Sequence, residues 1–182
     1  LVESSGDLWL LDATRESAPR QLTKTDAAES AARFSPDGAF VAFRREGEIH
    51  SLEIATLAGR AITSGSSDDI LHGTLDWVYD EEFGATDAFW WAPDSRSIAW
   101  LRFDQRDVPR YPIVDWSDIH PKAAWQHYPK AGDVNAVVRL GVTPAGPAAP
   151  PDGPAPQTRW IDVGGNPDIY LARVAWTPDG RL

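Results

Sequence analysis

The sequence predicts an all-β fold, namely a β-propeller fragment built from several four-stranded blades. One turn pattern recurs three times, as FSPDG at 34–38, WAPDS at 91–95 and WTPDG at 176–180. A second pattern repeats after about forty residues: GDLW at 6–9 leads to QLT at 21–23, and GEIH at 47–50 leads to AIT at 61–63. A period near forty, filled with short strands and turns, is typical of propeller blades. No long stretch has the 3.6-residue periodicity of a helix.

The recurring turn has a physical reason for its composition. Pro fixes φ at the second turn position, Asp tolerates the third, and Gly accepts the left-handed conformation that ends the turn. Short apolar segments, FVAF at 40–43 and IAWL at 98–101, follow the first two turns. Each of these regions is therefore expected to form a strand, a tight turn and a second strand.

Two stretches interrupt the blade pattern. Residues 143–156 are rich in Pro, Ala and Gly, and we expect an exposed loop of extended character. Residues 108–129 mix Pro with large apolar side chains, which predicts an irregular segment that rests against its own blade or a partner chain. These apolar residues are Tyr111, Ile113, Trp116, Trp125 and Tyr128.

The composition limits the function classes. The net charge is −10, which disfavours nucleic acid as a partner because no basic stripe is present to neutralise phosphates. No apolar run is long enough to insert into a membrane. The chain has no Met and stops within an expected hairpin at 178–182, so we expect residues 1–182 to be one partial propeller domain of a longer polypeptide.

Most familiar catalytic patterns are missing from the sequence. There is no Cys and no Gly-x-Ser-x-Gly, and the nearest run, GSSDD at 65–69, is interpreted as a polar turn. The four His residues lack metal-ligand spacing. We therefore expect no metal site, no cofactor and no catalytic nucleophile within this chain.

One acidic segment, DWVYDEEF at 76–83, stands between large apolar residues. Adjacent carboxylates repel, and apolar surroundings raise their pKa unless a cation is near. The residues alone leave two interpretations open. The acids form a solvated turn between strands, or they form a cation site in which two carboxylates receive one ammonium group.

The same segment resembles the Asp-Trp-Val-Tyr-Glu-Glu-Glu motif of the dipeptidyl peptidase IV family, in its bacterial type, within the prolyl oligopeptidase superfamily. The resemblance continues in order and approximate spacing through WWAPD at 90–94, YPKAG at 128–132 and Asn135. The blade repeats fit the same family, so the resemblance covers essentially the whole chain. Asp80 replaces the usual third Glu, Ala136 stands where Pro is expected, and the spacer from Glu82 to Trp90 is one residue shorter than in the animal enzymes.

The resemblance implies that Glu81 and Glu82 bind the α-ammonium group of peptide substrates with a free N-terminus. It implies a serine exopeptidase that releases N-terminal Xaa-Pro or Xaa-Ala dipeptides, with this propeller gating access. The catalytic triad would lie in an α/β-hydrolase domain after Leu182, and the family's carbonyl-binding Arg at or just before Leu1. Residues 108–129 would correspond to an arm that contributes to a homodimer.

Two other readings compete with this one. A non-catalytic propeller that serves as a binding scaffold would have the same blade repeat, because fold does not fix function. A superfamily peptidase of other specificity would not need an ammonium anchor, so the paired Glu residues argue against it. We expect an exported protein, periplasmic or secreted, with a cytoplasmic location as the alternative.

Overall fold

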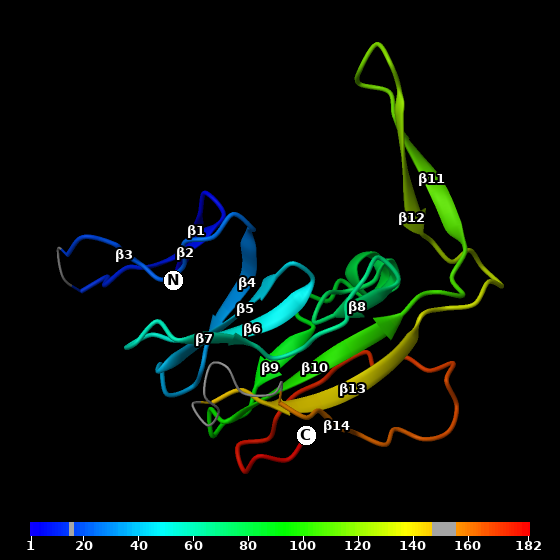
Figure 1. Ribbon diagram of the computed structural model, residues 1–182. Coiled ribbons are helices and arrows are strands. Elements are labelled where there is room, and N and C mark those ends of the chain that lie inside the picture. Colours follow the sequence, from blue (N-terminus) through cyan, green and yellow to red (C-terminus); the bar gives the residue numbers. More distant parts are fainter. Residues whose placement is uncertain (15–16, 147–155) are drawn as a thin grey trace.

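The computed structural model describes residues 1–14, 17–146 and 156–182. In these ranges the chain forms antiparallel sheets and one short helix (Figure 1). The first sheet has the order β1-β2-β3, with β1 at Val2–Ser4, β2 at Asp7–Leu10 and β3 at Arg20–Gln21. The second is a four-stranded meander with the order β4-β5-β6-β7, made of Glu29–Phe34, Phe40–Arg45, Glu48–Glu53 and Gly59–Ala61.

The third sheet has five strands. Its order is β14-β13-β10-β8, with β9 also paired to β10; the bounds are Arg159–Trp160, Val137–Pro144, Ser97–Asp104, Ile70–His72 and, for β9, Phe89–Trp91. A π-helix, η1 at Val78–Glu82, lies between β8 and β9 in the chain. β11 (Arg110–Asp115) and β12 (Lys122–His127) form a separate two-stranded hairpin. The all-β prediction is confirmed.

The pattern that repeats after about forty residues corresponds to equivalent hydrogen bonds in the first two sheets. Thr23 Oγ1 accepts the backbone N–H of Leu8 at 2.8 Å, and Thr63 Oγ1 accepts that of Ile49 at 2.9 Å. Each Thr hydroxyl also donates to a carboxylate, Thr23 to Glu29 and Thr63 to Glu48. The repeated Thr therefore accepts the equivalent backbone N–H in both sheets, whereas its carboxylate partner differs: Glu29 lies in the next sheet and Glu48 in the same sheet.

The three predicted turns also form alike. In each, a backbone N–H bonds the carbonyl three residues earlier at 2.9 Å: Gly38 to Ser35, Ser95 to Ala92 and Gly180 to Thr177. The donor residue has a positive φ in every case, 71°, 60° and 82° respectively. Ser95 adopts the left-handed conformation that Gly occupies in the other two turns, a conformation that costs a residue with a Cβ some energy.

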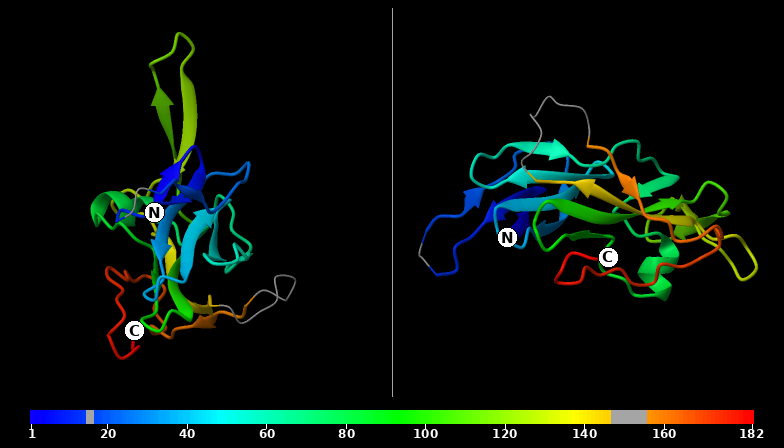
Figure 2. Two further views of the ribbon diagram at one scale, coloured as in Figure 1. Left: turned by 90° about the vertical axis from the view of Figure 1, so that its left-hand side faces the viewer. Right: turned by 90° about the horizontal axis from the view of Figure 1, so that it is seen from below.

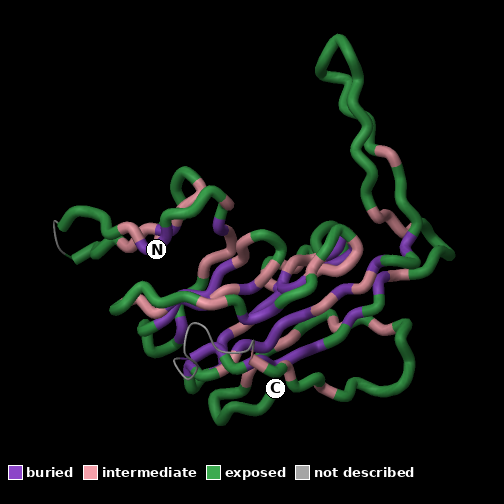
Figure 3. The backbone as a smooth tube through the Cα atoms, viewed as in Figure 1, coloured by how far each residue is buried: buried purple, intermediate pink, exposed green. Residues whose placement is uncertain are grey.

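Two core clusters lie between successive sheets, and a third packs one face of the third sheet against η1 and the C-terminal segment. Leu8 of the first sheet packs with Val41 and Phe43 of the second. Phe40 of the second sheet clusters with Trp91 and other residues of the third. Burial is concentrated along the central strands in Figure 3, whereas the projecting hairpin is almost entirely exposed. Apolar contact between sheet faces therefore holds the sheets together, as sheet packing requires.

Two sequence expectations need correction. Residues 108–129 are not irregular, because β11 and β12 pair in continuous antiparallel register from Arg110–His127 to Asp115–Lys122. The hairpin projects from the sheets in both Figure 1 and Figure 2. Tyr111, Ile113 and Val114 are aromatic or β-branched residues, which favour strands, and Pro112 is tolerated because a two-stranded hairpin leaves each strand one free edge.

The predicted loop at 143–156 begins too early. Thr143 and Pro144 belong to β13, and Thr143 is fully buried with its hydroxyl accepting a 2.8 Å hydrogen bond from Trp100 Nε1. Because Thr143 is buried and hydrogen-bonded, β13 continues past the predicted start of the loop and ends at Pro144. Residues 147–155 of the predicted loop lie outside the described residues.

Among the residues that are described, no helix has the length and apolar composition needed to cross a bilayer.

A half-buried carboxylate, that of Glu48, links the second and third sheets and makes stability depend on pH. Burial alone would raise the pKa of Glu48, but hydrogen bonds with His72, Thr63 and Ser66 outweigh it and hold the pKa at about 2. His72 Nδ1 lies 2.8 Å from Glu48 Oε2, and Ser66 N–H donates to Oε1 at 2.6 Å. Because the folded pKa lies below the ordinary 4.5, this stabilisation is complete above pH 4.5 and is lost as the pH falls toward 2.

We expect chemical unfolding of the full-length protein to show a midpoint that falls as the pH is lowered from 4.5 toward about 2. The Glu48→Gln variant should start from a lower midpoint and change less over the same interval, because its side chain does not titrate. Identical pH slopes in the two proteins would contradict this role of Glu48.

Candidate functional site

The acidic pair predicted from the sequence lies on η1. The helix has π geometry, since Phe83 N–H bonds the Val78 carbonyl five residues earlier at 3.1 Å. Such single-turn π-helices are rare and often occur at functional sites. The sequence analysis expected either a turn or a cation site here and did not predict a helix.

The buried side of η1 fixes its position. Val78 and Tyr79 are buried, and the Tyr79 ring meets the Phe103 ring edge to face with centroids 4.7 Å apart. Leu171 N–H donates to the Tyr79 hydroxyl at 2.6 Å, which joins the helix to the C-terminal segment. Burial raises the pKa of Tyr79 to about 12, so the phenol stays protonated. Aromatic packing and this hydrogen bond therefore hold the helix from both sides.

Asp76 orders the entry into η1. Its Oδ1 accepts the Tyr79 N–H at 3.0 Å, and its side chain is buried. Burial raises the pKa of Asp76 above its ordinary value, although this hydrogen bond counteracts part of the effect. Asp is common just before the first turn of a helix, where its carboxylate accepts a backbone N–H. Asp76 is therefore a helix-start signal that the sequence analysis could have used.

Glu81 and Glu82 occupy the exposed end of η1. Within the described part of the chain, neither carboxylate makes a hydrogen bond or an ion pair. Asp80, the preceding acid, is exposed as well. The chain thus presents consecutive free carboxylates on a helix whose opposite side is anchored. Such a pair can accept the hydrogen bonds of one cation with several N–H donors.

A neighbouring ion pair ties the segment after η1 to the second sheet. Arg33 of β4 donates to Asp87 at 2.7 Å, and Trp91 Nε1 donates to the Arg33 carbonyl at 3.2 Å. These contacts keep the loop between η1 and β9 against the adjacent sheet. The sequence analysis did not identify either Arg33 or Asp87.

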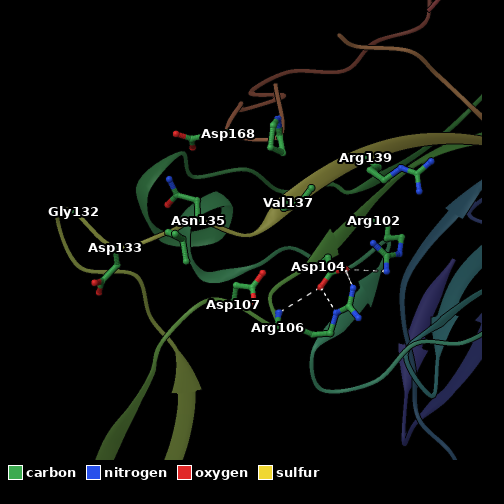
Figure 4. A pocket seen from close by; sticks show the side chains of 12 residues that line it. Arg102, Asp104, Arg106, Asp107, Gly132, Asp133, Asn135, Val137, Arg139 and Asp168 are labelled. Carbon is green, nitrogen blue, oxygen red and sulfur yellow. Dashed lines mark hydrogen bonds and ion pairs between the residues drawn. The ribbon is translucent and has the colours of Figure 1, made fainter. Parts of the chain in front are cut away.

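A cavity of about 780 Å³ lies away from η1, between β10, β13 and the C-terminal segment (Figure 4). Two of its cations are already occupied: Arg106 pairs with Asp104, and the Arg139 guanidinium stacks 4.1 Å from the Trp160 ring centroid. The hydrogen bond from Arg106 holds the pKa of Asp104 at about 2. Glu81 and Glu82 do not line this cavity, and we assign it no role.

Packed antiparallel sheets with recurring turns and recurring Thr bonds define this chain as part of a β-propeller region. The chain belongs to the dipeptidyl peptidase IV family: the family model described as "Dipeptidyl peptidase IV (DPP IV) N-terminal region" matches residues 2–182. The acidic segment that carried the resemblance lies inside that match.

The relatives agree with this assignment. The chain is 31% identical over 155 residues to the "Probable dipeptidyl peptidase 4" of Aspergillus flavus, covering 81% of this chain and 19% of that protein. It is 32% identical over 150 residues to the "Probable dipeptidyl-aminopeptidase B" of Pyrenophora teres f. teres, covering 75% and 16%. It therefore spans less than a fifth of the length of these curated relatives.

Solved structures give the same fold. The crystal structure of Porphyromonas gingivalis dipeptidyl peptidase 4 matches with a TM-score of 0.76 at 30% identity, over 88% of this chain and 22% of that one. A structure from Bacteroides ovatus matches with a TM-score of 0.66 over 88% and 20%; at 22% identity it is evidence for the fold alone.

Proposed function

We propose that residues 1–182 form the substrate-gating part of the propeller in a serine exopeptidase that releases N-terminal Xaa-Pro or Xaa-Ala dipeptides. Glu81 and Glu82 bind the α-ammonium group of the substrate. The catalytic Ser, Asp and His belong to an α/β-hydrolase domain outside these residues. The chain is thus a positioning and selecting element and contributes no reacting group.

The observation that carries this proposal is the pair of unpartnered carboxylates at the exposed end of an anchored helix. An ammonium group has three N–H donors, so each carboxylate can accept a charge-assisted hydrogen bond. A blocked or internal peptide has no such cation. If the anchor lies a fixed distance from the catalytic serine, it sets the cleavage point at two residues from the free end.

Rival functions make different demands on Glu81 and Glu82. A non-catalytic propeller scaffold, or a superfamily peptidase of other specificity, has no need of a free carboxylate pair at this place. A solvated turn would not need the buried Tyr79–Phe103 contact and the Leu171 bond that hold η1 rigid. These contacts favour a site in which the position of the carboxylates matters.

The test compares hydrolysis of Gly-Pro-p-nitroanilide and its N-acetylated form by the full-length protein. We expect cleavage of the free amine only. Equal rates for both substrates would remove the ammonium anchor and favour a peptidase of other specificity. Cleavage of neither would favour the scaffold.

We propose a second role, homodimerisation, for the hairpin of β11 and β12. Its apolar side chains are exposed, including Trp116 at 75%, Ile119 at 90% and Trp125 at 64%. Projecting apolar surface of this kind is typical of a contact with another chain, and a second copy is the simplest partner.

A bacterial origin and an exported, periplasmic or secreted location remain predictions.

The dimer prediction can be tested at the tip of the hairpin. The double variant Trp116→Glu, Ile119→Glu in the full-length protein should sediment as a monomer, because two carboxylates replace the exposed apolar contact. Ser117→Glu adds charge to the same turn without removing apolar surface and should stay dimeric. An unchanged dimer in the double variant would remove the hairpin from the interface.

A further inference from the structure

A pocket of about 230 Å³ lies between the second and third sheets. One side comes from the segment that follows β7, residues 62–65. The other side includes an aromatic row on the third sheet, made of His72, Trp100 and Trp160. The His72 and Trp100 rings meet edge to face with centroids 5.0 Å apart, and the Trp100 and Trp160 centroids are 5.3 Å apart. This space is the His72 pocket.

Gly141 allows the aromatic wall of the His72 pocket to close. It lies in β13, where it pairs with Trp100 on one side and Trp160 on the other. A Cβ at this position would lie 2.7 Å from Thr158 Cγ2 and 3.2 Å from an atom of each Trp ring. A side chain would force these groups apart, so glycine lets both rings and Thr158 approach the same space.

His72 supplies a hydrogen-bond acceptor to this pocket. Its Nδ1 lies 2.8 Å from Glu48 Oε2, and because the pKa of Glu48 is about 2 that carboxylate only accepts, so Nδ1 carries the proton. In the neutral ring Nε2 therefore has a lone pair. His72 is only 5% exposed, and Nε2 bonds no described residue. Nε2 is nevertheless accessible, because Arg44 Nε is the one described side-chain nitrogen or oxygen that is both enclosed and unbonded.

Thr158 supplies a hydrogen-bond donor. Trp100 Nε1 can only donate, and it donates to Thr143 Oγ1 at 2.8 Å. Thr143 is fully buried, so its hydroxyl proton goes to Thr158 Oγ1, also 2.8 Å away. The Thr158 hydroxyl must then donate in another direction, and no described residue accepts from it. Because Thr158 lines the pocket, this proton is available to a ligand.

The charges around the His72 pocket favour a neutral ligand. Its described lining contains no carboxylate, and its one cation, Arg102, is paired with Asp104 at 3.4 Å. Thr63 also lines the pocket, but its hydroxyl already accepts one hydrogen bond and donates another. A carboxylate ligand would face the Nε2 lone pair of His72, whereas a hydroxyl group can both donate and accept. The volume is below the roughly 300–1,000 Å³ of sites for drug-sized ligands, so the ligand is small.

We propose that the His72 pocket binds a small neutral polyol, namely a single sugar ring of the pyranose type. One ring hydroxyl donates to His72 Nε2, and another oxygen of the sugar accepts from the Thr158 hydroxyl. The C–H groups of the ring pack against Trp100 and Trp160, the second of which is 36% exposed. No residue of η1 is among the described lining, so this site is independent of the proposed ammonium anchor.

The test is a saturation-transfer NMR titration of the full-length protein with D-glucose, D-galactose and D-mannose. It is run at about pH 8, above the range in which histidine side chains ordinarily gain a proton. We expect saturable binding of at least one sugar, and none of tetrahydropyran, which has the same ring without hydroxyl groups. Thr158→Val should weaken binding of the preferred sugar about five- to tenfold, because it removes the donor with little change of shape. Thr14→Val makes the same change at an exposed position in the first sheet and should leave the affinity unchanged.

The wild-type titrations decide the proposal even if Thr158→Val fails to fold. If none of the three sugars binds saturably, the pocket holds only water and the proposal is wrong. Equal binding of tetrahydropyran would overturn the recognition of hydroxyl groups, and tighter binding of acetate than of any sugar would mean an anion site governed by Arg102. Trp160→Leu locates the ligand, since sugar binding that is unchanged in this variant would lie outside the pocket and contradict the proposal.

Discussion

Replacing Glu81 or Glu82 with Ala in the full-length protein is expected to lower kcat/KM for Gly-Pro-p-nitroanilide roughly a hundredfold, about 2.7 kcal/mol. In the proposed complex the full-length protein shields the substrate's ammonium group from water, so removing one carboxylate would leave that group partly unpaired. Breaking such a pair typically costs about 2–5 kcal/mol. Steady-state kinetics with free-amine substrate measures the loss directly.

Two further variants separate charge from shape. Glu81→Gln keeps the size of the side chain but removes its charge, so it should lose nearly as much activity as Glu81→Ala. Asp26→Ala removes an exposed carboxylate outside the site and should leave kcat/KM unchanged. If both Glu variants retain full activity, the acids form only a solvated helix end.

Replacing Phe103 with Ala is expected to weaken the local fold by about 3–5 kcal/mol. Phe103 is fully buried in β10, and its ring packs against Tyr79, which in turn anchors η1. Loss of the ring leaves a cavity beneath the helix that carries the acidic pair. The effect should therefore appear both as lower stability of β10 and as weaker binding of the substrate amine.

Native-state hydrogen exchange of β10 and η1 amides in the full-length protein measures this loss, because it reports local opening free energies. Phe34→Ala is the control, since it makes the same change at a position that is 41% exposed in β4. We expect it to cost much less. Equal losses from the two substitutions would mean that the Tyr79–Phe103 contact does not support the site.

The sequence was informative where structure follows from local chemistry. The Pro-Asp turns close through bonds between residues three apart, and the repeated Thr at 23 and 63 accepts a backbone N–H of its own sheet, so the repeating pattern marked both features. The positions of Glu81 and Glu82 side by side followed directly from the motif. Their setting on a helix was missed, because this short helix has no periodic apolar signal and Asp76 is the one local sign of its start.

What stabilises η1 is remote in the chain. The Tyr79 hydroxyl is held by Leu171, 92 residues later, and no short window of sequence contains both. The hairpin at 108–129 was mistaken for an irregular segment because its Pro residues concealed the strand alternation.

The bond between Tyr79 and Leu171 also has a consequence for biosynthesis. As the chain leaves the ribosome, Glu81 and Glu82 emerge long before the segment that completes their support. Contacts this distant in sequence form late, after the loop between them has closed. The support of η1 is therefore completed only when downstream chain arrives, and a nascent polypeptide truncated before Leu171 carries both acids without the hydrogen bond that Tyr79 provides.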